Sequence, residues 1–428
     1  MRRRALVLLS RDPGGRRTGR KAVLSTIVES LRTLDLEVVV VVIGSEPLES
    51  PPPAFAGVTM KSVPAPGPGR AGLAAGASFL TGRRSLNECL YRSGPTRREV
   101  ADIVREVDPD VIVADMIRCA ALVENLDAPV FVDLDDLLSE RYRAIATDDD
   151  GDSVLGYYEE RLPRSVRWAA RAVARRLLRR ESGVLARREV AVARWAAGVS
   201  LVSRREGAEL SRRSGVPVDY LPMAFAPPDI PADAGRARPG SFVLTGGLDY
   251  RANLVSLRWF CAEVLPLLSD DVRLGFCLTV VGHCPPAVRA ELERPGVRLL
   301  GYVDDLDAEL RRHRGFLAPI TSGTGIKTKV LEAMALGLPV VSTPGGVAGL
   351  DQGEPLRWLE ASDAQTFANA VRRLSRDPAL ASATGLAGRE YVSRQFSPEV
   401  LAERWRAALS PIVPSLGRPE NSGTAAPP

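Results

Sequence analysis

A loop and the helix that follows it, at residues 319–335, carry the residue types that hold a phosphorylated ligand. Gly323 and Gly325 lack side chains, so the backbone there can approach a ligand closely. The amides and the dipole of a helix N-terminus attract an anion. Lys327 and Lys329 stand in the first turn of this predicted helix, where a cation opposes the dipole unless an anion lies between them. We therefore expect a diphosphate at this loop.

Glu332 comes later on the same predicted helix, three residues after Lys329 and five after Lys327. A carboxylate accepts hydrogen bonds from two neighbouring hydroxyls at once, as a ribose presents them. The order along the helix therefore predicts the diphosphate first and the ribose second. The alternative is a plain surface helix with a Lys–Glu pair, because pairs three or four residues apart are common on helices.

Apolar runs without polar alternation predict strands buried on both faces, which is typical of parallel sheets. In the first half of the chain they are residues 5–10, 38–43, 111–114, 129–132 and 198–202. In the second half they are residues 242–244, 278–281, 297–300, 315–318 and 339–342. Helical patterns alternate with them, among them 21–34, 97–107, a helix beginning near Ser203 and an amphipathic helix over 398–409. The sequence therefore predicts an α/β protein with two doubly wound, Rossmann-like domains.

The boundaries follow from composition along the 428 residues. We expect an N-terminal domain over 1–222, in which residues 47–70 are a Pro-rich, irregular connection. A linker dense in Pro, Gly and Ala follows at 223–240, and a second domain over 241–395. A helix within 396–411 and a disordered tail at 412–428 complete the chain.

The overall composition, with 45% hydrophobic and 25% charged residues, provides a large core without a metal or disulfides. The five cysteines include no CxxC pair, which favours a reducing cytoplasm. Only two histidines are present, which disfavours a His-based zinc site or triad. No run of about 18 apolar residues exists, so we expect no membrane span.

The run GTGIKTKVLEAMALGLPVVSTPGGVAGL, which begins at Gly323, resembles the donor site of the retaining GT-B enzymes known as glycosyltransferase family 4. Upstream, FVLTGGLDYRAN at 242–253 and GYVDDL at 301–306 resemble further motifs of the same domain, in the same order. The resemblance implies two Rossmann-like domains facing a cleft, with the last helix crossing back to the N-terminal domain. It also implies transfer of a sugar from a nucleoside diphosphate to a hydroxyl acceptor, with retention and without a metal or other cofactor.

The family motif can be carried over residue by residue. Glu332 would then bind the donor ribose, and Tyr302 and Val303 would flank the nucleobase. The diphosphate would receive backbone amides from Gly323, Thr324, Gly325 and Ile326.

Two departures from the family pattern bear on the sugar and on the charge. The family has a second glutamate eight positions before the ribose-binding one, where this chain has Thr324. The Arg and Lys of the domain's first loop are replaced by Gly247 and Ala252. We expect Lys327, as a catalytic cation, and Arg251 to supply the missing charge, while the identity of the sugar stays open. Thr324 also supports an alternative, a GT-B protein that binds nucleotide without turnover.

In the N-terminal half, Gly14 and Gly15 follow the first strand, where a GT-B fold brings backbone near the donor phosphates; a simple turn is the alternative. Asp135 falls where the family often has a histidine near the sugar. This carboxylate could bind a sugar hydroxyl or the acceptor, or it could cap the turn that follows.

The same stretch supports a rival function. Residues 130–136, VFVDLDD, resemble the start of haloacid-dehalogenase-type phosphohydrolases, which would use Asp133 and Asp135, with Asp133 as the nucleophile, and would bind magnesium. Against this, the chain continues with Leu137 and Leu138 rather than Gly-Thr, and the second half stays unexplained. A DxD motif also marks the other glycosyltransferase fold, which two doubly wound halves disfavour.

Residues 161–194 are strongly basic, with eleven Arg, two Glu and no Lys. On a helical wheel Val173 and Leu177 share one face, while Arg175 and Arg179 share the opposite one. Such a helix fits an anionic membrane surface, and the alternative is a solvated helix. We find no nucleic-acid motif and expect no nucleic-acid partner. The acceptor is expected to be a glycan, a lipid-linked sugar or a small molecule, by default in cell-envelope or exopolysaccharide synthesis.

Overall fold

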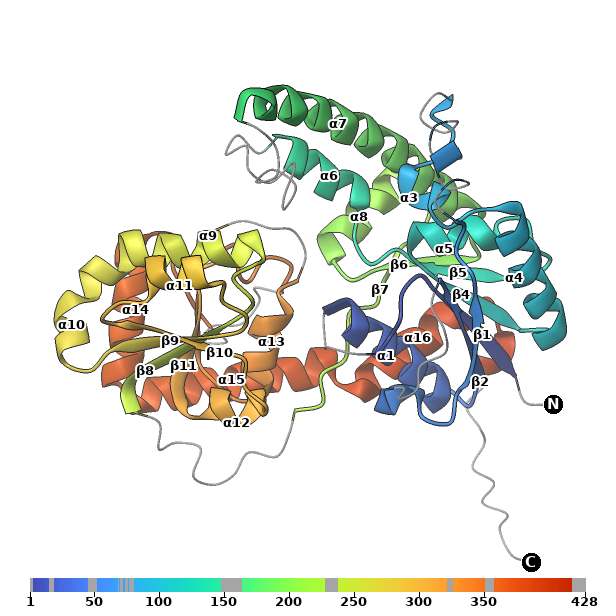
Figure 1. The fold of residues 1–428 in the computed structure, drawn as a ribbon. Helices are drawn as coiled ribbons and strands as arrows, with labels where there is room; N and C mark the ends of the chain where they lie inside the picture. Colours follow the sequence, from blue (N-terminus) through green and yellow to red (C-terminus); the bar gives the residue numbers. More distant parts are fainter. Residues whose placement is uncertain are drawn as a thin grey trace, which may run out of the picture. The chain divides into compact units, whose positions relative to one another are not determined.

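The structure is a computed structural model. It describes residues 3–14, 19–44, 52–67, 69, 72–73, 76, 81–147, 164–227, 238–321, 326–350 and 358–417. The chain forms two compact units (Figure 1). The N-terminal unit combines Met1–Met223 with Pro398–Pro428, and the C-terminal unit is Ala224–Ser397.

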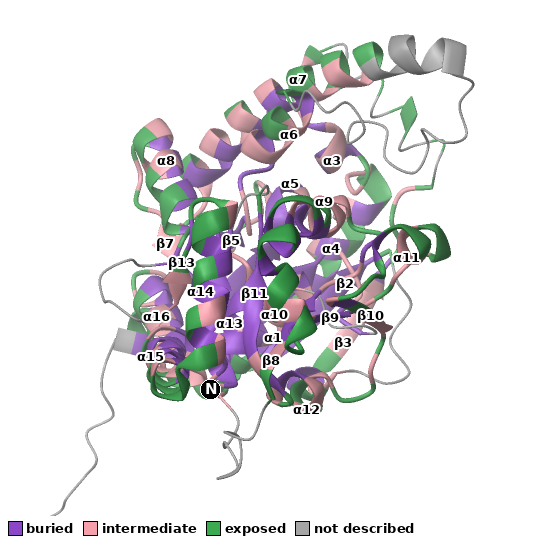
Figure 2. Cartoon of the chain, turned by 90° about the vertical axis from the view of Figure 1, so that its left-hand side faces the viewer, coloured by how far each residue is buried: buried purple, intermediate pink, exposed green. Residues whose placement is uncertain are grey.

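The N-terminal unit contains a parallel sheet of seven strands in the order β3-β2-β1-β4-β5-β6-β7. Its strands are β1 (Arg4–Leu9), β2 (Glu37–Ile43), β3 (Thr59–Val63), β4 (Val111–Asp115), β5 (Val130–Asp133), β6 (Gly198–Leu201) and β7 (Asp219–Tyr220). The central strands are apolar and almost fully buried, as the purple ribbon in Figure 2 shows. This burial on both faces is the reason for their unbroken hydrophobic runs.

Helices cover both faces of this sheet. They are α1 (Gly19–Thr33), η1 (Pro53–Phe55), α3 (Leu86–Cys89), α4 (Gly94–Val107), α5 (Met116–Val123), α6 (Leu138–Thr147), α7 (Arg164–Trp195), α8 (Arg204–Ser214), α16 (Pro398–Leu409) and η5 (Pro414–Gly417). Helix α8 begins after the N-cap Ser203 and ends at Gly215 in the left-handed conformation. Helix α16 packs against α1, and its buried Trp405 lies 5.3 Å from the ring of Phe131.

The C-terminal unit contains a six-stranded parallel sheet in the order β10-β9-β8-β11-β12-β13. The strands are β8 (Arg238–Thr245), β9 (Cys277–Val281), β10 (Val297–Gly301), β11 (His313–Ala318), β12 (Val340–Ser342) and β13 (Leu359–Glu360). The helices are α9 (Arg251–Trp259), η3 (Phe260–Val264), η4 (Leu265–Leu268), α10 (Ser269–Arg273), α11 (Pro286–Leu292), α12 (Leu306–Arg311), α13 (Thr328–Ala335), α14 (Ala364–Arg376) and α15 (Pro378–Phe396).

Each sheet has its first strand in the middle, with the next two strands on one side and the later ones on the other. The direction of winding therefore reverses between β1 and β4 in the N-terminal unit, and between β8 and β11 in the C-terminal unit. Ligands of doubly wound proteins bind outside the carboxyl ends of the strands at this reversal. The loops after β1, β4, β8 and β11 therefore lie where such a ligand would bind.

The predicted apolar strands are confirmed, but two predictions are wrong. Residues 47–70 are not wholly irregular, because they contain η1 and the edge strand β3. The middle residues of β3 are half-buried, and two of them, Lys61 and Ser62, are polar, so the strand lacks an apolar run. The tail is ordered as far as residue 417, because Val413 and Leu416 are buried. Residues 228–237 of the predicted linker and 418–428 of the predicted tail lie outside the described residues.

Candidate functional site

The loops that follow β8, β9 and β10 are tied to one another by backbone hydrogen bonds. The amide of Gly246 donates to Val281 O at 2.8 Å, and that of Gly282 donates to Gly301 O at 2.8 Å. Gly282 has φ +143°, and a Cβ there would lie 2.6 Å from the carbonyl carbon of Gly246. Only glycine allows this close approach, so the three strand ends form one surface.

Lys329 reaches from α13 across to this surface. Its Nζ donates to Asn253 Oδ1 at 2.5 Å, and Asn253 Nδ2 donates to the carbonyl of Gly247 at 2.8 Å. A Cβ on Gly246 would lie 3.1 Å from the same Nζ. The ammonium group of Lys329 therefore lies directly at the reversal between β8 and β11.

Electrostatics distinguishes Lys329 from an ordinary surface lysine. Burial, and secondarily the neighbouring charge of Lys327, lower the pKa of Lys329 to about 8, against the attraction of Glu332. Among the described residues, no carboxylate lies within ion-pairing distance of its Nζ. A bound anion would supply the missing counter-charge.

The sequence predicts an anion beside both lysines of this first turn, but the donor-binding and catalytic roles expected from it fall on Lys327 alone. Lys327 is the N-cap residue, and Glu332 is half-buried further along α13. Lys329 is marked out by its hydrogen bond to Asn253, which lies 76 positions earlier, so no local sequence pattern reveals it. Of the predicted phosphate loop, Ile326 is described and half-buried, whereas Gly323, Thr324 and Gly325 lie outside the described residues. Arg251 is the first residue of α9.

An aromatic pair lies at the carboxyl ends of β9 and β10. The rings of His283 and Tyr302 are stacked, with centroids 6.0 Å apart and an interplanar angle of 27°. Tyr302 is 57% exposed, and His283 Nδ1 lies 3.6 Å from Asp249 Oδ1. Val303, beside Tyr302, is half-buried. This exposed, flat surface suits stacking against a planar ring.

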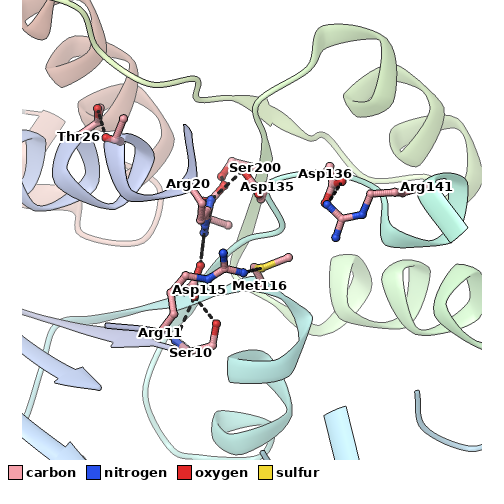
Figure 3. Close-up of polar contacts among 12 residues, drawn as sticks. Ser10, Arg11, Arg20, Thr26, Asp115, Met116, Asp135, Asp136, Arg141 and Ser200 are labelled. Atoms are coloured by element: carbon pink, nitrogen blue, oxygen red, sulfur yellow. Dashed lines mark hydrogen bonds and ion pairs between the residues drawn. The ribbon is translucent and has the colours of Figure 1, made fainter. Parts of the chain in front are cut away.

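The reversal in the N-terminal unit is occupied by a buried charge network (Figure 3). Arg20 contacts Asp115, and its Nη1 lies 2.8 Å from Asp133 Oδ2 and 3.1 Å from Asp135 Oδ1. Asp115 also accepts hydrogen bonds from the amide of Ser10 at 3.0 Å and from its hydroxyl at 2.6 Å. The network therefore joins the carboxyl ends of β1, β4 and β5 to α1.

Burial alone would favour neutral forms of these groups. For Arg20, the three carboxylates outweigh burial and hold its pKa well above the ordinary value. Burial raises the pKa of Asp133, against the attraction of Arg20. For Asp115, Arg20 and Ser10 outweigh burial and lower the pKa. Arg20 is thus the shared ion-pair partner of three carboxylates.

Asp135 is the member of the network that reaches the surface. Its side chain is 20% exposed, against 1% for Asp115 and Asp133, and its φ of +66° is left-handed. Gly14 is buried in the loop after β1, and Gly15 lies outside the described residues. Asp133 is fully buried and bound by Arg20 and by Ser200 Oγ at 2.9 Å, so it cannot act as a nucleophile on a substrate. This position argues against the phosphohydrolase interpretation.

Comparisons with known proteins concern the C-terminal domain and the fold. Residues 239–377 match the family model described as Glycosyl transferases group 1, and no curated protein matches the chain. Sucrose-phosphate synthase from Thermosynechococcus elongatus has a similar structure, with 16% identity, a TM-score of 0.65 and coverage of 96% of this chain and 100% of that one. Anabaena HepE in complex with UDP is similar at 14% identity, a TM-score of 0.61 and coverage of 95% and 99%.

A third similar structure is a mutant of S. aureus TarM in complex with fondaparinux, alpha-GlcNAc-glycerol and UDP. It has 11% identity, a TM-score of 0.63 and coverage of 96% of this chain and 99% of that chain. The fold and the matched domain define this protein as a glycosyltransferase with the GT-B fold. Its group 1 glycosyltransferase domain, at residues 239–377, lies within the C-terminal unit.

Proposed function

We propose that this enzyme transfers a sugar from a nucleoside diphosphate sugar, held by the C-terminal unit, to a hydroxyl acceptor. The observation that carries the proposal is the contact of Lys329 with Asn253 beside Gly246, at the reversal between β8 and β11. A half-buried ammonium group without a carboxylate partner among the described residues, at the N-terminal turn of α13, is suited to a diphosphate.

The rest of the donor is assigned around this cation. Lys327 and Arg251 add positive charge beside the diphosphate, with the amides of the loop that ends at Ile326. Glu332 binds the ribose hydroxyls, and Tyr302 with Val303 flanks the base. Anabaena HepE has been solved with UDP, so uridine is the first base to test.

The chemical step follows from where charge develops. The bond from the anomeric carbon to the diphosphate breaks, the bond to the acceptor oxygen forms, and a leaving phosphate oxygen takes the acceptor proton. Lys327, Lys329 and the α13 dipole stabilise the negative charge on the departing diphosphate. Both oxygens lie on the same face of the sugar, which retains the configuration as in glycosyltransferase family 4, and no metal is required. Asp135 accepts a hydrogen bond from a hydroxyl of the acceptor or of the sugar.

The donor assignment predicts that Glu332→Ala loses nucleotide affinity without losing the fold. In a thermal-shift panel of UDP, GDP, ADP and TDP, one nucleotide should stabilise the wild type by about 2.7 kcal/mol at 100 times its dissociation constant. It should stabilise the variant much less. Glu390→Ala, an exposed change on α15 of the same unit, serves as the control and should respond as the wild type. Equal nucleotide responses in all three proteins would remove Glu332 from the site.

Turnover separates the enzyme from a protein that only binds nucleotide, because only the enzyme releases the nucleoside diphosphate from its donor.

For the acceptor, we propose a glycan or lipid-linked precursor of the cell envelope or of an exopolysaccharide. TarM, whose complex contains fondaparinux and alpha-GlcNAc-glycerol, and the lipopolysaccharide outer core galactosyltransferase WaaB share the fold.

A peripheral membrane contact through α7 is part of this proposal. In the part of α7 whose side chains are described, Val173 is 68% and Leu177 38% exposed, next to exposed Arg176, Arg179 and Arg180. Basic residues near an anionic surface contribute about 1 kcal/mol each. Of the helices that the structure describes, none has the length and apolarity of a membrane span.

The membrane contact predicts binding to vesicles that contain anionic lipid, and weaker binding to neutral ones. Replacing Arg176, Arg179 and Arg180 by Gln should reduce the binding to anionic vesicles at least tenfold, whereas Gln at Arg97, Arg98 and Arg105 of α4 should not. Co-sedimentation with the vesicles measures both. Undiminished binding of the α7 variant would show that this helix is solvated.

A further inference from the structure

Two arginines at the reversal in the N-terminal unit take no part in the Arg20 network. Arg11 follows β1 directly after Ser10, and Arg118 lies in the first turn of α5, directly after β4. Strands β1 and β4 are parallel neighbours, with Leu8 opposite Ala114. Both arginines therefore leave the same edge of the sheet, where ligands of doubly wound domains bind.

The two guanidinium groups converge on one sulfur atom. Arg11 Nη2 lies 3.7 Å and Arg118 Nη2 3.0 Å from Met116 Sδ, and Figure 3 shows Arg11 extending toward Met116. A thioether is a weak acceptor and carries no charge. Within the described part of the chain, neither guanidinium forms an ion pair with a carboxylate, and the Nε of Arg118 is buried without a hydrogen-bond partner.

The backbone and a ring hold this arrangement. Met116 is buried and has φ +63°, a conformation that is rare for a bulky residue and that concentrates at functional sites. The guanidinium carbon of Arg118 lies 5.5 Å from the centroid of the Tyr91 ring, a cation–π distance that orients the planar group. The nearby carboxylates are already bound by Arg20.

We propose that Arg11 and Arg118 bind a phosphate group carried by the acceptor, so that the hydroxyl acceptor of this enzyme is a phosphorylated molecule. Guanidinium groups offer forked donors that match phosphate oxygens. That the phosphorylated ligand is the acceptor rests on the proposed function, whereas the phosphate site itself rests on the geometry of Arg11 and Arg118. The phosphate is assigned to the acceptor rather than to the donor because Lys329 and α13 already provide for the donor diphosphate.

Calorimetric titration of the full chain with inorganic phosphate tests the site, with glycerol as an uncharged comparison. The donor-unit variant Lys329→Gln serves as the starting protein, because it removes the other proposed phosphate cation. Adding Arg11→Gln and Arg118→Gln should weaken phosphate binding about tenfold or more. Adding Arg98→Gln and Arg143→Gln, which remove the same two charges from exposed positions on α4 and α6, should leave it unchanged.

Three results would overturn the proposal: loss of all phosphate binding in Lys329→Gln alone, equal weakening in the two double variants, or full binding without Arg11 and Arg118.

Arg118→Lys keeps the positive charge but loses the paired N–H donors of the guanidinium group, so we expect intermediate affinity. Unfolding curves confirm that each variant is folded. If Glu332→Ala leaves nucleotide binding intact, the donor assignment fails while the phosphate titration still reports on Arg11 and Arg118. The two failures are therefore distinguishable.

Discussion

Arg20→Met is expected to lower the free energy of unfolding by about 3–5 kcal/mol. The substitution keeps an unbranched side chain about as long as the aliphatic part of arginine but removes the guanidinium group that contacts Asp115, Asp133 and Asp135. Two of these carboxylates are almost fully buried, so they would be left without a counter-charge in a low-dielectric interior. Urea unfolding at pH 7 measures the loss.

The loss should depend on pH in a defined direction. Without Arg20, the folded-state pKa of Asp133 rises further above its unfolded value, and that of Asp115, which Arg20 and Ser10 hold low in the wild type, rises as well because burial is no longer opposed by the guanidinium group. Such groups contribute stability that is fully present below the unfolded pKa, near 4, and that is lost as the pH rises through the folded pKa. The gap between wild type and variant should therefore widen from pH 4.5 to pH 7.5.

The matched control for this prediction is Arg4→Met in β1 of the same unit. Arg4 pairs with Glu37 at 3.4 Å, but both side chains are about half exposed, at 47% and 48%. Exposed pairs contribute about 0–1 kcal/mol, so the control should unfold nearly as the wild type does. If the two Met variants lose similar amounts, the buried network does not organise this unit.

Lys329→Met is expected to lower turnover by a factor on the order of 100–1,000, as removal of a preorganised transition-state partner does. The same change should leave the protein as stable as the wild type or more stable. The pKa of Lys329 is lowered from its ordinary value of 10.5 to about 8 in the folded state, so the charged form is disfavoured by up to roughly 3 kcal/mol. This penalty is present below pH 8 and disappears as the pH rises toward the unfolded value.

Initial rates with the donor, together with urea unfolding at pH 7, measure both halves of this prediction. In the wild type, kcat/KM should fall as the pH rises through about 8, because Lys329 loses its charge. Lys61→Met, which removes an exposed lysine of the N-terminal unit, should change neither quantity appreciably. Wild-type turnover in Lys329→Met would shift the catalytic role back to Lys327.

The local elements of this protein could be read from its sequence. Unbroken apolar runs such as residues 38–43 predicted buried parallel strands, and Ser203 marked the start of α8. The edge strand β3 was missed because only one of its sides is paired and Lys61 and Ser62 interrupt the apolar pattern. The placement of Lys327 and Glu332 on one helix also followed from local pattern, since it requires only the helical repeat.

The sequence by itself thus determined two doubly wound halves, the strand-loop-helix segment at residues 315–335 and the final helix. Only the tertiary structure decided which charges meet. Arg20 and Asp133 are 113 positions apart, Arg11 and Met116 are 105, and Lys329 and Asn253 are 76. Hydrophobic periodicity reports whether a segment is buried and in which conformation. It does not report strand order, and it is the order that brings the carboxyl ends of β1 and β4, or of β8 and β11, side by side.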